Sequence, residues 1–259
     1  MPSREITVQT SGGVCTITIR RAHKRNALAP AHLVALREAL LAAGSDLACR
    51  VVVLTGEGQK AFCAGADLSG EAAFFAPGRQ GATTELGDLI RARRTLDQPL
   101  IGRINGACYA GGMGLLALCD LAIASAEATF ALPEINVGLF PFVVLAAFAD
   151  HPAQSTLREL AITGQPIAAA RAEQTGLITR QVPLSDLDAQ IDSLAQSIAR
   201  KPPQALRAGR AALRQSSDAA FLAALAEAEA RSLALSQQPE AREGLAAFRE
   251  KRPSGAPHG

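Results

Sequence analysis

The 259-residue sequence contains no tryptophan and one tyrosine, and aromatic residues make up only 4% of it. An excess of one charge is also lacking, because 24 aspartates and glutamates balance 26 lysines and arginines to a formal net charge of +2. Proteins that bind nucleic acids need a basic surface for the phosphates, and single-strand binders also use aromatic side chains that stack on bases. Since the sequence offers neither feature, we expect no nucleic-acid partner.

Cysteine and histidine are too few and too scattered to predict a disulfide framework or a metal centre. The five cysteines are an odd number without CxxC spacing, and the four histidines share no spacing typical of metal ligands. A GxSxG motif is also absent, which argues against a Ser-His-Asp hydrolase. We therefore predict reduced thiols in the core and no metal site. The residues in question are Cys15, Cys49, Cys63, Cys108, Cys119, His23, His32, His151 and His258.

Long hydrophobic runs and a leader pattern are missing as well. The most apolar window, residues 139–149, is too short to cross a bilayer, and the first residues lead directly into a strand-like pattern without the apolar region of a signal peptide. We expect a cytoplasmic protein with no membrane association. With 48% hydrophobic residues, the chain can still bury a substantial core.

The pattern of apolar residues predicts a mixed α/β fold. Two alternating, β-branched runs, 6–10 and 14–20, flank Ser-Gly-Gly and predict a β-hairpin. After the hairpin, helical and buried-strand patterns alternate, which is typical of a largely parallel sheet with right-handed crossovers. The predicted helices are 30–44, 85–96 and 112–119, and the predicted strands are 51–56, 100–104 and 121–125.

Beyond about residue 152 the composition shifts toward Ala, Leu, Glu, Arg and Gln, and only 177–182 has an extended pattern. Helices without a strand layer must bury their apolar stripes on the rest of the chain or on another copy, which favours self-association. We divide the chain into a core of residues 1–200 and a C-terminal helical region of residues 201–259. The late helices are predicted at 187–200, 205–215, 218–235 and 240–250.

Two glycine-bearing turns, 61–68 and 105–114, follow buried strands and are candidates for a ligand site. Small residues let a ligand approach the backbone, and free N–H groups at a helix N-terminus stabilise an oxyanion. Glycine turns by themselves often do no more than close a turn. The spacing of Gly111, Gly112 and Gly114 excludes the dinucleotide-binding fingerprint.

In order and sequence, these two turns resemble the two oxyanion-hole motifs of the crotonase superfamily, the family of enoyl-CoA hydratases and isomerases. Pro133-Glu134-Ile135 follows at the expected distance, segment 20–28 resembles the family's coenzyme A segment, and 247–252 resembles the end of its late helix. The resemblance covers about residues 5–252. It implies a spiral of β-β-α units, a C-terminal trimerisation region, an acyl-CoA thioester substrate with no separate cofactor, and homotrimers or homohexamers.

The resemblance also implies roles for individual residues. It makes the N–H groups of Ala66 and Gly111 the two hydrogen-bond donors to the thioester carbonyl. Two such donors stabilise the negative oxygen of an enolate more than they stabilise the neutral thioester. Glu134 matches an acid/base glutamate. The implied substrate-binding residues are Lys24, Arg25, Ala27, Ala64, Asp67, Leu68, Tyr109, Gly112 and Phe140.

Some of these residues also have an ordinary structural interpretation. Lys24 and Arg25 are phosphate contacts if coenzyme A binds there, and are solvated surface charges otherwise. Asp67 is typical of residues that hold their own loop, and for Tyr109 we favour packing over a place in the acyl pocket.

The chain departs from the family's hydratases at one position, because the first of their two glutamates would fall at Gly114. A single carboxylate can take a proton from C2 and return it at C4, which favours Δ3-Δ2 isomerisation over hydration. The runs 107–112 and 139–142 are also more similar to isomerases. Two alternatives remain: a hydratase whose second carboxylate is Glu71, Glu85 or Asp88, and a non-catalytic acyl-CoA-binding protein.

Overall fold

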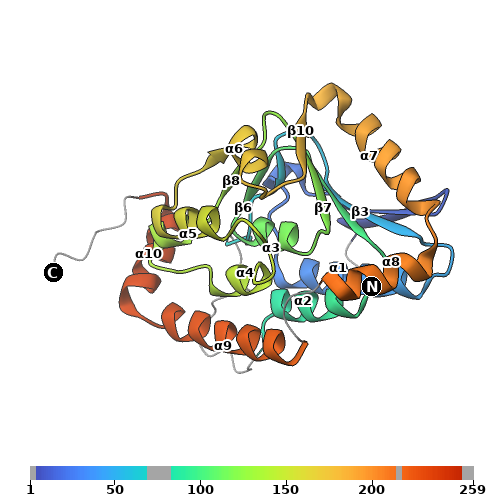
Figure 1. Ribbon diagram of the computed structural model, residues 1–259. Coiled ribbons are helices and arrows are strands. Elements are labelled where there is room, and N and C mark those ends of the chain that lie inside the picture. Colours follow the sequence, from blue (N-terminus) through green and yellow to red (C-terminus); the bar gives the residue numbers. More distant parts are fainter. Residues whose placement is uncertain (1–3, 69–82, 214–217, 253–259) are drawn as a thin grey trace.

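A six-stranded sheet forms the larger half of the fold in the computed structural model, which describes residues 4–68, 83–213 and 218–252 (Figure 1). The strand order is β1-β2-β3-β5-β7-β10. The predicted hairpin is confirmed as an antiparallel pair, and every other neighbouring pair in this sheet is parallel. The strands are β1 (Ile6–Ser11), β2 (Val14–Ile19), β3 (Val51–Gly56), β5 (Leu100–Ile104), β7 (Leu121–Ser125) and β10 (Arg180–Val182).

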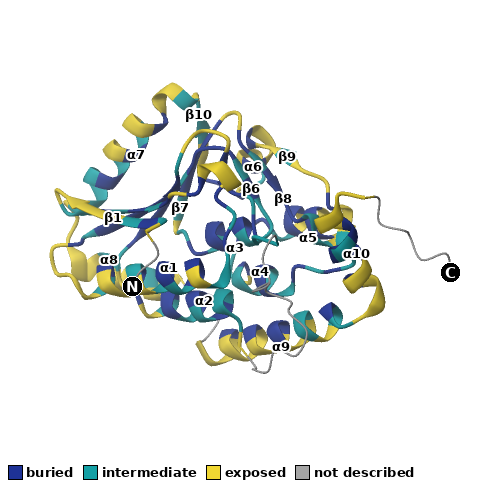
Figure 2. Ribbon diagram, turned by 180° about the vertical axis from the view of Figure 1, so that it is seen from behind, coloured by how far each residue is buried: buried dark blue, intermediate teal, exposed yellow. Residues whose placement is uncertain are grey.

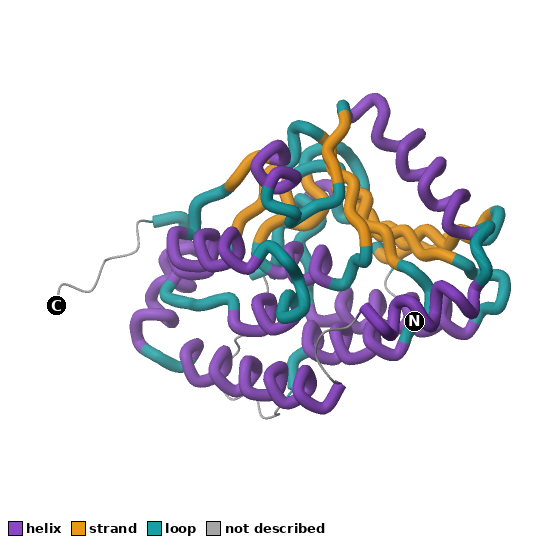
Figure 3. Tube along the Cα trace, in the orientation of Figure 1, coloured by secondary structure: helices purple, strands orange, loops and turns teal. Residues whose placement is uncertain are grey.

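A second, smaller sheet has the order β4-β6-β8-β9. Figure 3 draws the strands of both sheets in orange. Strands β3 and β4, then β5 and β6, then β7 and β8 follow each other along the chain, and each pair gives one strand to each sheet. This arrangement confirms the spiral of β-β-α units. The periodicity did not predict the small sheet, because strands of two or three residues are too short to show alternation. They are β4 (Ala61–Cys63), β6 (Ala107–Tyr109), β8 (Thr129–Ala131) and β9 (Ile167–Ala168).

Helices cover both faces of the large sheet (Figures 1 and 2). On one face, α7 packs Leu187 and Ile191 against Val51, Val53 and Ile123. On the other face, α1 and α2 pack beside each other over the main core. The helices up to residue 199 are α1 (Pro30–Ser45), α2 (Glu85–Thr95), α3 (Gly111–Ala117), α4 (Phe142–Ala147), α5 (Gln154–Thr163), α6 (Ala169–Gln174) and α7 (Leu184–Ala199). The sequence pattern did not predict α4, and it gave no bounds for α5 and α6, which lie in the stretch beyond residue 152 that was expected to be helical.

The last three helices are α8 (Pro203–Leu213), α9 (Asp218–Ser236) and α10 (Pro239–Glu250), and two of them pack on their own chain. Phe221 and Leu225 of α9 are buried in the main core, and Leu245 of α10 packs against Leu139. Helix α8 differs, because it contacts its own chain through ion pairs, Arg210 with Asp120 at 2.9 Å and Arg207 with Asp97 at 2.8 Å, and none of its residues is buried. Its Leu213 is 79% exposed. The boundary between core and tail at residue 200 stays a prediction.

From the sequence we expect neither a membrane-spanning segment nor a metal site. Within the described ranges, no helix is long and apolar enough to cross a membrane. The same residues contain no group of three or more side chains that could hold a metal ion.

Candidate active site

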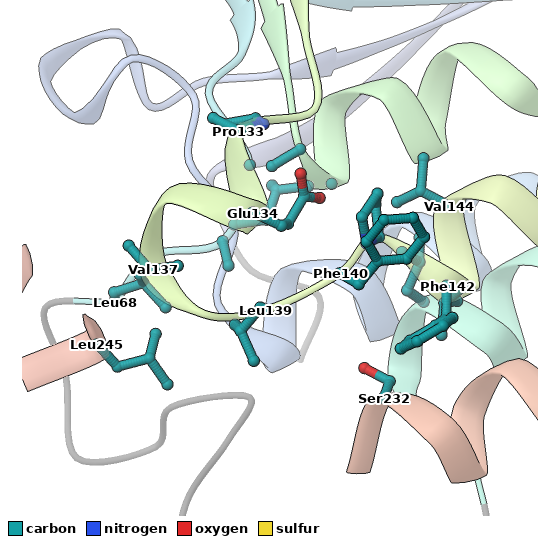
Figure 4. Close-up of a pocket in the computed structure, with 18 of the residues that line it drawn as sticks. Leu68, Pro133, Glu134, Val137, Leu139, Phe140, Phe142, Val144, Ser232 and Leu245 are labelled. Carbon is teal, nitrogen blue, oxygen red and sulfur yellow. The ribbon is translucent and has the colours of Figure 1, made fainter. Parts of the chain in front are cut away.

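A cavity of about 320 Å³ lies where the turns after β4 and β6 meet the C-terminal helices. Its other walls come from a 3-10 helix, η2 (Pro133–Val137), and from the segment that leads into α4. The lining is mostly hydrocarbon (Figure 4). The lining residues include Ala64, Ala66, Leu68, Thr84, Leu86, Gly111, Glu134, Phe140, Phe142, Val144, Ser232 and Leu245.

The backbone of Ala66 is oriented by a short parallel pairing with Leu28. The Leu28 N–H donates to the Gly65 carbonyl at 2.8 Å, and the Asp67 N–H donates to the Leu28 carbonyl at 2.7 Å. Because this pairing uses groups of the residues on either side, the N–H of Ala66 points away from Leu28. Gly65 makes the turn possible with a φ of 98°. We find no acceptor for the Ala66 N–H among the described residues.

Gly111 supplies the second N–H group at the start of α3. The first N–H groups of a helix have no partner within the helix, and we find no acceptor for this one in the described ranges. A Cβ built on Gly111 would lie 3.9 Å from the nitrogen of Ala66, so the two donor segments are close neighbours. Gly112 has a different role, because a Cβ there would collide with the Cys63 carbonyl; its small size lets α3 pack against β4.

Among the described residues that line the cavity, Glu134 has the only ionisable side chain. Figure 4 shows its carboxylate pointing into the cavity on the side of Phe140 and Val144. Its Oε2 atom is buried without a hydrogen-bond partner in the described part of the chain. Burial raises the pKa of Glu134 from 4.5 to about 7, because desolvation penalises the charged form. A carboxyl group with such a pKa can accept and return a proton near neutral pH.

Position 114, where a hydratase of this family would have its first glutamate, faces hydrocarbon. A Cβ on Gly114 would lie 3.2 Å from a methyl of Leu86 and 3.5 Å from one of Val144. The other carboxylates considered from the sequence do not fill this place. Glu85 and Asp88 are on α2 and do not line the cavity, and Asp88 pairs with an arginine at 3.3 Å; Glu71 lies outside the described residues.

The structure separates the predicted binding residues into those that line the cavity and those that lie near it. Ala64, Leu68 and Phe140 line it together with Ala66, Gly111 and Glu134. The segment of Lys24, Arg25 and Ala27 runs beside the turn after β4, and the Lys24 ammonium pairs with Asp67 at 3.0 Å.

Tyr109 does not line the cavity. Its hydroxyl forms a hydrogen bond with the Thr129 hydroxyl at 2.9 Å, between β6 and β8 of the small sheet. This contact agrees with the packing role that we favoured for Tyr109 from the sequence.

Sequence reasoning did not identify the cavity walls that come from α2, α9 and α10. Helix α9 is held against α2 by Glu229, which is 2% exposed, accepts a hydrogen bond from the Thr84 hydroxyl at 2.9 Å and pairs with Arg91. Ser232, one turn further along α9, thereby reaches the cavity. An amphipathic pattern predicts that such residues are buried, but it does not say against which segment.

Residues 9–255 match the family model described as enoyl-CoA hydratase/isomerase. The chain is 34% identical over 254 residues to the 2,3-dehydroadipyl-CoA hydratase of Escherichia coli, with 96% of each chain covered. It is 33% identical to the hydroxycinnamoyl-CoA hydratase-lyase of Pseudomonas fluorescens, over 80% of this chain and 77% of that protein. An enoyl-CoA hydratase/isomerase structure from Pseudoalteromonas atlantica has a TM-score of 0.87 at 26% identity, over 98% of this chain and 100% of that one.

The fold and the site therefore define an enzyme of the crotonase superfamily. Within that superfamily, the chain belongs to the enoyl-CoA hydratase/isomerase family.

The Glu134 carboxyl, whose Oε2 atom is buried, should lower the stability of the fold as the pH rises. Its folded-state pKa of about 7 lies above 4.5, so between these values the unfolded chain binds fewer protons than the folded one, and stability falls with increasing pH. We therefore compare the free energies of unfolding of Glu134→Gln and the wild type. Their difference should increase in favour of Glu134→Gln by roughly 3 kcal/mol between pH 4.5 and about pH 7. Urea unfolding at a series of pH values measures it, with the exposed Glu240→Gln as control. A difference that does not change with pH would contradict the prediction.

Proposed function

We propose that this protein isomerises enoyl-CoA thioesters and uses Glu134 as its single acid/base. The observation that supports this most directly is that, among the described residues, the one ionisable side chain that lines the cavity shares it with two N–H groups for which we find no acceptor, while Leu86 and Val144 surround Gly114 with hydrocarbon. These features fit the transfer of a proton between two carbons of the substrate, and the described side chains nearest Gly114 include no second carboxylate that would hold a water molecule.

In the proposed reaction, the thioester oxygen of a 3-enoyl substrate accepts hydrogen bonds from Ala66 and Gly111. Glu134 removes a proton from C2, and the electron pair of the broken C–H bond forms the C1–C2 double bond of an enolate whose negative charge lies on the oxygen. Two fixed donors stabilise this charge more than they stabilise the ground state. Glu134 then returns the proton to C4 as the double bond moves to C2–C3, so no other reactant is consumed.

Hydration is the second candidate, because the similar proteins from Escherichia coli and Pseudomonas fluorescens are named as a hydratase and a hydratase-lyase. A hydratase of this type would need a second polar group to hold water near C3. The described residues around Gly114 provide none, since Leu86 and Val144 occupy that wall. The raised pKa of Glu134 and the unused donors argue for turnover rather than for passive acyl-CoA binding.

Product analysis separates these functions. We expect rapid conversion of 3-enoyl-CoA to 2-enoyl-CoA, with kcat/KM increasing through about pH 7 as Glu134 ionises, and slow or absent hydration of crotonyl-CoA. Glu134→Gln should reduce isomerisation by about 10²- to 10⁴-fold and leave product binding largely intact. Glu85→Gln on α2 serves as the control. Near wild-type turnover by Glu134→Gln, or rapid hydration without isomerisation, would overturn the proposal.

We propose that coenzyme A binds with its phosphates near Lys24 and Arg25, both of which are exposed beside the turn after β4. Replacing both with alanine should weaken coenzyme A binding more at low salt than at high salt, because exposed charges are screened. Calorimetry at two ionic strengths measures this. Unchanged affinity at low salt would contradict the assignment.

In this proposal the end of the acyl group that is far from the thioester is a hydrocarbon and lies against Leu86, Phe142 and Val144. A carboxylate at that end of the acyl group would lose its hydration there without gaining a partner. Saturated thioesters bind without isomerising, so their affinities can be compared directly. Because adipyl-CoA carries a terminal carboxylate and hexanoyl-CoA does not, adipyl-CoA should bind at least about a hundredfold more weakly. Ser232→Lys should improve adipyl-CoA binding relative to the uncharged Ser232→Met. Equal affinity of the wild type for both thioesters would exclude a hydrocarbon-specific pocket.

We also propose that the protein is a homotrimer or homohexamer and that it is cytoplasmic. Helix α8 supports association, since it buries none of its residues in its own chain and exposes Leu213. Light scattering at micromolar concentration should give three or six times the 26.9 kDa chain mass. A monomer under these conditions would contradict the proposal.

A further inference from the structure

Arg21 does not line the cavity, yet it contacts Asp67, the residue after Ala66, and Ala27, the residue before Leu28. Its side chain is only 7% exposed and reaches three separate segments. The Nε atom donates to Glu5 Oε1 at 3.2 Å, an Nη1 N–H donates to the Ala27 carbonyl, and an Nη2 N–H donates to Asp67 Oδ2 at 3.0 Å. One buried guanidinium therefore joins the start of the chain, the segment before Leu28 and the residue after Ala66.

These contacts bear on the direction of the Ala66 N–H. Ala27 precedes Leu28, whose pairing with Gly65 and Asp67 orients Ala66. Arg21 thus holds Ala27 and Asp67, which are the neighbours of the two paired residues, and so supports the pairing that turns the Ala66 N–H away from Leu28. Hydrogen bonds weaken steeply when the donor is misaligned, and an oxyanion hole acts only when its donors are already in place.

The other members of the network keep the guanidinium in one orientation. Glu5 also contacts His32 Nε2 at 2.7 Å, and Asp67 also binds the Lys24 ammonium at 3.0 Å. A buried ion network gains little net stability after its desolvation cost, whereas the planar fork of an arginine fixes its partners in direction. This geometry indicates that the Arg21 network orients the segments that it contacts and adds little to the stability of the fold.

We propose that Arg21 is a positioning residue that aligns the Ala66 N–H with the thioester carbonyl. The inference rests on the proposed role of Ala66 as an oxyanion donor. A misaligned Ala66 N–H stabilises the enolate much less, whereas the neutral bound thioester loses little stabilisation. A substitution of Arg21 therefore lowers kcat and leaves the affinity for a saturated thioester nearly unchanged.

The neighbouring Arg20 provides a matched control, because it pairs with Glu57 at the surface and is 54% exposed. Arg21→Lys and Arg20→Lys are compared in three measurements: kcat for isomerisation, affinity for hexanoyl-CoA, and the infrared carbonyl stretch of bound hexanoyl-CoA labelled at its thioester carbon. For Arg21→Lys we expect kcat to fall about 10- to 100-fold, within the loss caused by removing a whole donor. Its affinity should stay within about threefold, and its carbonyl stretch should move back toward that of the free thioester. Arg20→Lys should change none of them.

Asp67→Asn tests the same contact with a residue of the same shape, and it replaces Arg21→Lys if that variant does not fold. A carbonyl stretch that stays at its wild-type position in the folded variant would overturn the inference, even if kcat falls. A wild-type protein whose bound thioester shows no carbonyl shift would instead overturn the proposed oxyanion hole, so the two failures are distinguishable.

Discussion

The site depends on the close approach of two backbone segments, the turn after β4 and the N-terminus of α3. A Cβ on Gly65 would lie 2.8 Å from the Ala110 side chain, and one on Gly112 would collide with the Cys63 carbonyl. Only small residues permit this contact, and it places the N–H groups of Ala66 and Gly111 beside each other. The small sheet sets the distance between the segments, because its strands β4 and β6 form a parallel pair and lead directly into them. The chemistry of the site is therefore a consequence of backbone packing more than of reactive side chains.

Much of this arrangement could be predicted from the sequence, because it is local. The hairpin, the strands of the large sheet and most long helices show clear periodicity, and the glycine turns could be identified by their position after buried strands. The small sheet was not visible, since its strands are shorter than the period that would reveal them. Ala66, Gly111 and Glu134 were selected by resemblance to a family, and the structure places all three on one cavity.

The features that could not be predicted arise from contacts between distant residues. The state of Glu134 depends on its burial, which is produced by segments that no pattern connects to it. Arg21 and Asp67 are 46 positions apart and form an ion pair only once the strands are assembled. Nothing in the sequence distinguishes Arg20 from its neighbour Arg21. In the folded protein Arg20 is an exposed surface charge, whereas the Arg21 side chain is buried and holds several segments together.

The cavity wall contributed by α9 and α10 has a consequence for biosynthesis. The backbone donors and Glu134 all lie within the first 134 residues, whereas Ser232 and Leu245 join them from near the end of the chain. A ribosome that adds 5–20 residues per second needs roughly 5–20 s to make the last hundred residues. During that interval the nascent chain carries Ala66, Gly111 and Glu134 but not the wall that α9 and α10 contribute. The cavity therefore closes only after α9 and α10 have been made, and a chain that stopped before α9 would leave the proposed oxyanion donors and Glu134 open to water.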